Sequence, residues 1–169
     1  RTIAIHAQTA RRDQLRAMKE LDIEPSFFAA HSFYWGDWHR EVTLGPVRAD
    51  HISPQRAAFD LGLRPTIHND SPIVPPDMIR LIWSAATRRT RSDDILGPGE
   101  RVTPYEALQE ITSNASYQLR EEHLKGTLEP GKLADMVILD ADPLSTPPER
   151  LLDLRVVATI KEGRYIFGE

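Results

Sequence analysis

The 169-residue sequence contains no cysteine, which excludes disulfide bonds and thiolate metal sites together. It has no apolar run long enough to cross a membrane and no signal peptide. Basic residues are not in excess, since 21 Lys and Arg stand against 25 Asp and Glu. Nucleic acid and membranes are therefore not expected as partners, and we expect a cytoplasmic protein. Any metal site must use histidine and carboxylate side chains.

The first predicted strand begins at the second residue of the sequence. The sequence opens with Arg1 instead of methionine, and residues 2–6 already read as the interior of a strand. We therefore expect either that a preceding segment is removed or that this sequence is a piece of a longer chain.

Strands and helices alternate over the first 125 residues. Apolar runs predict strands at 2–7, 26–30 and 65–69, and helices are predicted at 10–21, 54–61 and 78–86. The aromatic segment 32–39 is predicted to be a loop, and the polar segment 88–101 an exposed loop. This alternation is typical of an α/β fold with parallel strands.

The remaining chain changes character. The capping box Thr103-Pro104-Tyr105-Glu106 predicts a helix from Pro104 to about Ser113, and a second short helix is expected at 114–120. After a turn at 126–131, strands are predicted at 135–139, 156–160 and 164–167, the last two as a hairpin about Glu162-Gly163. We therefore expect a boundary near residue 125, with one unit at 1–125 and a second at 126–169.

Asp70 follows the predicted strand at 65–69. If that strand belongs to a parallel α/β barrel, Asp70 lies at the rim where such barrels build their active sites. A carboxylate there is a candidate metal ligand or general base. The alternative is a loop-capping aspartate that bonds the backbone of Ser71 or Ile73.

Two histidines also lie at the ends of predicted strands, His6 at the C-terminal end of the first and His31 directly after the second. Three successive strands would thus bring a metal ligand or proton carrier to one rim. His68 lies one pleat below Asp70 and is expected to orient it or to line the pocket floor. The aromatic residues of segment 32–38, Trp35 among them, either form a substrate wall beside His31 or anchor their own loop.

Three motifs carry a resemblance to a known family. They are His6-Ala7-Gln8, the stretch from Asn69-Asp70-Ser71-Pro72 to Pro75-Pro76-Asp77, and the run from Lys125-Gly126-Thr127 to Val137-Ile138-Leu139. Together they resemble the amidohydrolase superfamily, in the branch that includes N-substituted formamide deformylase. The third motif is the most specific, because in that superfamily it marks the return of the chain from the barrel to a small β-sandwich.

The resemblance covers the whole chain but only the last part of such an enzyme. It implies the C-terminal part of a (β/α)8 TIM barrel, with about three strand–helix units, followed by strands of a small β-sandwich. By motif, His6 corresponds to the histidine that ends the sixth barrel strand and Asp70 to the aspartate that ends the eighth. The family's His-x-His pair and its fourth- and fifth-strand ligands have no counterpart in this sequence.

The chemistry implied is metal-dependent hydrolysis of amide-type C–N bonds. His6 and Asp70 would hold a divalent metal, zinc with iron or manganese as alternatives, and Asp70 would also transfer the proton. His31, Trp35 and His68 would contact a small-molecule amide substrate. The sequence predicts that this chain is inactive by itself. It also predicts that the chain associates with the missing N-terminal part or with other copies of itself. The competing hypothesis is a non-catalytic structural or assembly module derived from a barrel.

Overall fold

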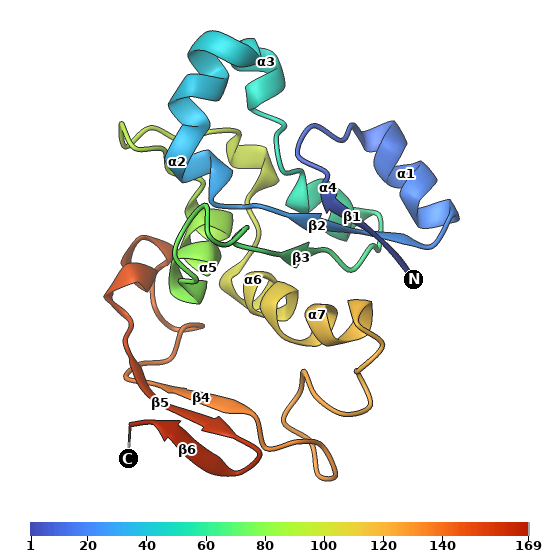
Figure 1. Ribbon diagram of the computed structural model, residues 1–169. Helices are drawn as coiled ribbons and strands as arrows, with labels where there is room; N and C mark the ends of the chain where they lie inside the picture. Colours follow the sequence, from blue (N-terminus) through green and yellow to red (C-terminus); the bar gives the residue numbers. More distant parts are fainter. Residues whose placement is uncertain (169) are drawn as a thin grey trace.

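The computed structural model describes residues 1–168 as a mixed α/β structure with two three-stranded sheets (Figure 1). The first sheet is parallel, in the order β1-β2-β3, and consists of Thr2–His6, Ile23–Phe27 and Thr66–Ile67. The second is antiparallel, in the order β4-β5-β6, and consists of Met136–Leu139, Val156–Lys161 and Arg164–Phe167. The second sheet lies at the end opposite α2 and α3 (Figure 1).

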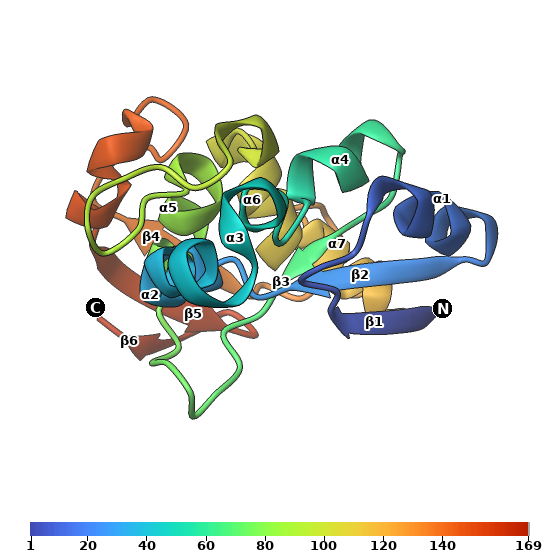
Figure 2. The same ribbon diagram turned by 90° about the horizontal axis from the view of Figure 1, so that it is seen from above.

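Helices connect the parallel strands and bury one side of them. α1, Arg12–Glu20, joins β1 to β2, and α4, Gln55–Asp60, precedes β3. Leu15 from α1 packs with Phe27 of β2 and with Ala57 and Ala58 of α4. This apolar contact holds the two helices on the same side of the strands, as Figure 2 shows from above.

A larger core lies between α5, Met78–Thr87, and α6, Pro104–Ile111. Phe28, Leu81 and Ala107 are part of it. The short 3-10 helix η3, Pro148–Asp153, adds Leu151 to the same core, so the chain between β4 and β5 returns to pack against α5.

The segment predicted as an aromatic loop is helical, and that prediction is wrong. α2 covers His31–Trp38 and continues as a turn of π-helix, η1, His39–Thr43, before α3, Gly45–Ala49. Gly36 allows this helix to pack closely against its surroundings. A Cβ at this position would lie 2.8 Å from Cγ2 of Thr90, so the missing side chain lets α2 pack directly against the following loop.

The loop at 88–101 is exposed at residues 91–94 and 98–99, as its polarity predicted, but its other residues are partly or fully buried. Arg88 is fully buried and donates to the backbone carbonyls of Leu96, Ile52 and Ser53. Leu96 is also fully buried, and a 3-10 helix, η2, covers Pro98–Glu100. Satisfied hydrogen bonds to distant carbonyls let a guanidinium enter the interior, and composition alone does not reveal such partners.

Two strands differ in extent from the prediction. β2 begins three residues earlier than expected and ends at Phe27, because buried Glu24 accepts a hydrogen bond from the Arg64 N–H and Pro25 pairs with Ala4. β3 is only two residues long. His31 is consequently the first residue of α2 and does not follow β2 directly.

Several local predictions are confirmed. Thr103 caps α6, and Glu106 completes the capping box. The second short helix is α7, Ser113–Gln118, and β5 and β6 form the expected hairpin. Within residues 1–168 no helix is both long and apolar enough to cross a membrane.

Candidate metal centre

Four polar side chains meet at the C-terminal ends of β1 and β3. The His6 and His68 rings lie 4.8 Å apart at 77°, and the His6 and His31 rings are stacked with centroids 6.0 Å apart. Asp70 Oδ2 lies 3.9 Å from His6 Nε2. The structure therefore brings together His6, His31, His68 and Asp70, although they come from three separate segments.

The backbone turns sharply at both ends of this cluster. His6 has a φ of 65° and Asp70 a φ of 51°, both in the left-handed region. The turn takes His6 out of the regular strand alternation, and its ring lies against His68 and His31. The loop-capping alternative for Asp70 finds no support among the described residues, since the Ile73 N–H bonds the backbone carbonyl of Asp70 and not its carboxylate.

Burial keeps two of the imidazoles neutral. Desolvation, followed by repulsion from neighbouring His39, His6 and His68, lowers the pKa of His31 to about 4. Burial, followed by the charge of His6, also lowers the pKa of His68. At neutral pH these rings have a free nitrogen lone pair, which is the form that binds a metal or accepts a hydrogen bond.

Three imidazole nitrogens in the cluster are buried without a hydrogen-bond partner among residues 1–168: His6 Nδ1, His31 Nδ1 and His68 Nε2. Buried polar atoms are nearly always paired in folded proteins, so three such atoms together indicate a missing bonding partner. Within residues 1–168, however, no three or more His, Asp or Glu side chains are arranged to hold a metal. His6 and Asp70 lie near each other in this cluster, and their role as metal ligands stays a prediction.

Trp35 lies beside this cluster and the other aromatic residues of α2 lie elsewhere. Its ring contacts His31 at 5.4 Å between centroids, edge to face. Phe33 instead packs against Trp83 of α5, and Trp38 is 55% exposed. Phe33 thus packs α2 against α5, whereas Trp35 borders the candidate site, where its contact with a substrate stays a prediction.

His39 was assigned no role from the sequence, yet its ring lies 5.8 Å from that of His31. His31, Trp35, His39 and Thr43 follow one another at intervals of four residues. On a helix such residues lie along one ridge. Treating the segment as a helix would therefore have revealed His39.

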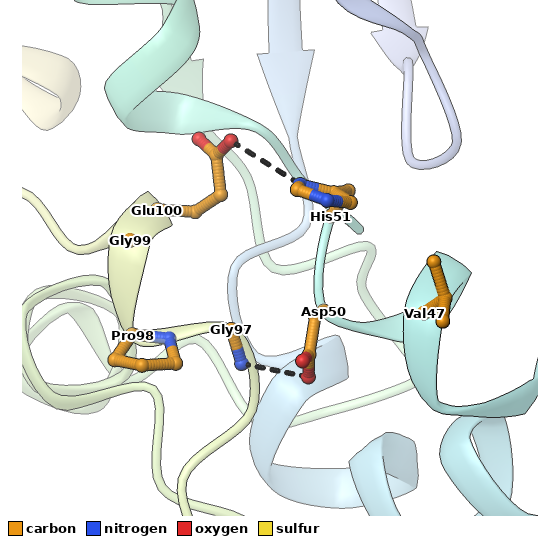
Figure 3. A pocket seen from close by; sticks show the side chains of 7 residues that line it. All are labelled: Val47, Asp50, His51, Gly97, Pro98, Gly99 and Glu100. Atoms are coloured by element: carbon orange, nitrogen blue, oxygen red, sulfur yellow. Dashed lines mark hydrogen bonds and ion pairs between the residues drawn. The ribbon is translucent and has the colours of Figure 1, made fainter.

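A surface hollow of about 420 Å³ lies away from these residues, between α3 and η2 (Figure 3). Its carboxylates are committed to the fold: Asp50 accepts from the Gly97 N–H at 3.1 Å, and Glu100 accepts from the Ala57 N–H at 3.0 Å. Neither His6 nor Asp70 lines it. We therefore place the candidate site at the histidine cluster.

Several known proteins share sequence and fold with this chain. The chain is 29% identical to N-substituted formamide deformylase of Arthrobacter pascens over 94% of its own length and 29% of that enzyme. An uncharacterized metal-dependent hydrolase from Pyrococcus furiosus superposes with a TM-score of 0.71 at 31% identity, over 85% of this chain and 29% of that one. The chain thus spans less than a third of the length of either protein.

A more distant structure shares the fold. The zinc-bound adenosine deaminase of Xanthomonas campestris superposes with a TM-score of 0.71 at 18% identity, over 98% of this chain and 37% of that one. The sequence profile of the amidohydrolase family matches residues 1–167, which is nearly the whole chain. This chain belongs to the amidohydrolase family.

Proposed function

We propose that this chain supplies one part of the active site of a metal-dependent hydrolase that cleaves amide-type C–N bonds other than peptide bonds. The observation that carries the proposal is the meeting of His6 and Asp70 among buried imidazole nitrogens that lack partners. Membership of the amidohydrolase family supports hydrolysis, and the relative from Arthrobacter pascens is named for deformylation of N-substituted formamides.

The donor atoms fit a divalent metal. His6 and Asp70 offer an imidazole nitrogen and a carboxylate oxygen, which suit zinc, with iron and manganese as alternatives. Zinc is our first choice because the related structure from Xanthomonas campestris holds it. Two ligands are fewer than the three that a catalytic zinc site ordinarily takes from protein, so the remaining ligands must come from outside residues 1–168.

When bound, such a metal makes a water molecule acidic enough to supply hydroxide at neutral pH. The Asp70 carboxylate takes the proton from the attacking water and passes it to the leaving amine. The ring of His6 lies beside Asp70, with Nε2 3.9 Å from Oδ2. His68 lies below as the floor, and neutral His31 offers a hydrogen-bonding group to the substrate.

The substrate side of the site is largely apolar. Phe28 is fully buried with its ring 4.4 Å from that of His31, and Trp35 borders His31 on another side. We therefore favour an apolar or aromatic N-substituted amide over a phosphate or a polyanion.

The architecture proposed for the whole protein is a barrel with a small sandwich. The parallel sheet β1–β3 would form the last three of eight barrel strands, and β4–β6 would belong to the sandwich, with the boundary near residue 125. Ile5 of β1 is 60% exposed, and β1 has an unpaired edge among the described residues. Three strands leave open edges, so the sheet requires more of the protein, or another copy, to complete it.

Replacement of the proton carrier tests the proposal. In the full-length protein, Asp70→Asn is expected to keep the fold and to reduce turnover of N-substituted formamides by about a hundred- to ten-thousand-fold, the range for a lost general base. Asp22→Asn is the matched control, because Asp22 is exposed and has nearly the same backbone conformation, with a φ of 53°.

Turnover and metal content are measured together. Near-normal activity of Asp70→Asn would show that the proton carrier lies elsewhere. A full-length protein that binds no divalent metal and hydrolyses no amide would instead favour the non-catalytic module, the alternative that the small number of ligands within residues 1–168 supports. For the 169-residue chain alone we expect neither tight metal binding nor turnover.

A further inference from the structure

His39 links two segments that each border the candidate site. Its Nε2 lies 3.0 Å from Nε2 of Gln8, in the loop that follows β1. Its Nδ1 lies 3.1 Å from Oγ1 of Thr43, one π-helical turn later in η1. Both nitrogens of the ring are thus engaged within the protein, unlike those of His6, His31 and His68.

The direction of these bonds fixes the tautomer. The amide nitrogen of Gln8 can only donate, so His39 Nε2 must be the acceptor. The proton then resides on Nδ1, which donates to the hydroxyl of Thr43. Burial lowers the pKa of His39, which keeps the ring neutral and the arrangement intact at neutral pH.

Gln8 also joins a third segment. Its backbone carbonyl accepts from the Ser53 N–H at 2.7 Å, just before α4. Gln8 is only two residues from His6, and its side chain reaches across to His39. The loop after β1, the end of α2 and the start of α4 are therefore fastened to one another at this point.

His31 depends on such support because its ring has a buried nitrogen with no hydrogen bond among the described residues. Its orientation is set by packing alone, against the rings of His6, Phe28, Trp35 and His39. Of these, His39 is the one held by hydrogen bonds at both nitrogens.

We propose that His39 is a positioning residue. Held between Gln8 and Thr43, it supports the His31 ring in its stacked place over His6 and so shapes the substrate side of the site. The role of His31 rests on the proposed function, whereas the hydrogen bonds of His39 do not.

Three substitutions separate its two bonds. In the full-length protein, His39→Gln places an amide near the position of Nε2 and keeps the bond to Gln8, whereas His39→Asn places one near Nδ1 and keeps only the bond to Thr43. His39→Ala removes both. His123→Ala is the control, since His123 is an exposed histidine on another part of the surface.

The kinetic expectation is a change in KM rather than in kcat. We expect His39→Ala and His39→Asn to raise KM for an N-substituted formamide by about fivefold to tenfold, the effect of about one lost hydrogen bond, with kcat within about twofold. His39→Gln should remain within about threefold of the parent. Equal KM values for His39→Ala and His39→Gln, or a fall confined to kcat, would overturn the proposal.

A spectroscopic measurement distinguishes this proposal from the proposed function. Long-range ¹H–¹⁵N correlation on ¹⁵N-histidine-labelled full-length protein reports which ring nitrogen carries the proton. We expect His39 as the Nδ1–H tautomer, and a shift of the His31 ring signals in His39→Ala but not in His39→Gln. Both results can be obtained from a protein that hydrolyses nothing. A His39 proton on Nε2, or unmoved His31 signals in His39→Ala, would refute the positioning role.

Discussion

Replacing the buried Arg88 tests whether its hydrogen bonds hold the loop at 88–101 in place. Nε donates to the Leu96 carbonyl at 2.6 Å, Nη2 to Ile52 at 2.9 Å and Nη1 to Ser53 at 3.3 Å. Arg88→Met preserves most of the side-chain volume and removes all three donors. The end of α5, the loop and the approach to α4 then lose their common attachment.

The expected loss can be worked out from these contacts. Three buried carbonyl oxygens lose a charged donor, at about 1–3 kcal/mol each. Part of that is offset because the variant no longer buries a guanidinium, a cost visible in the pKa of Arg88, which burial lowers to about 10. We expect a net decrease of about 3 kcal/mol in the free energy of unfolding, or roughly 6–12 °C in Tm for a domain of this size.

Urea denaturation followed by circular dichroism measures the difference. Arg89→Met is the matched control, because the neighbouring Arg89 pairs with Asp93 near the surface, where an ion pair contributes at most about 1 kcal/mol. Arg88→Lys keeps the charge but not the three-way geometry and should fall between the two. If Arg88→Met loses no more stability than Arg89→Met, the buried hydrogen bonds do not hold the loop.

Two further predictions concern the interior. Glu110 is fully buried beside Gln55, and burial raises its pKa well above the usual value. Its stabilising contribution is therefore complete below the unfolded pKa of about 4.3 and is lost as pH rises through the folded pKa, by up to ~1.4 kcal/mol per pH unit. Denaturation of Glu110→Gln at several pH values should show a free energy of unfolding that depends less on pH than that of the parent. An unchanged pH dependence would contradict this. Gly36→Ala should lower stability by about 1 kcal/mol through its clash with Thr90, although alanine favours helix. Adding Thr90→Ser removes the clashing methyl and should restore the loss, and calorimetry of the double variant checks it.

The parts of the fold that sequence predicted best are those fixed by neighbouring residues. The start of α6 depends on Thr103 and Glu106, three positions apart, and it was found where expected. α2 was missed, and its packing involves a close approach of Gly36 to Thr90, fifty-four residues later, which the local sequence does not reveal. Arg88 was expected at the surface because its acceptors at Ile52 and Ser53 are distant in sequence.

In the candidate site, too, some residues could be predicted from the local sequence and others could not. The ends of strands indicated His6 and Asp70, and the structure brings these two together. Their roles remain predictions. His39 was missed because a loop was expected in place of α2, and a loop has no regular spacing that would align His39 with His31.

The left-handed backbone at the site has an energetic consequence. His6, Ala7 and Asp70 all have positive φ values, at 65°, 39° and 51°. For residues other than glycine such conformations cost of order 1–3 kcal/mol each. Glycine would adopt a positive φ without this cost, so the surrounding fold, and not the preference of these three residues, maintains their backbone conformation.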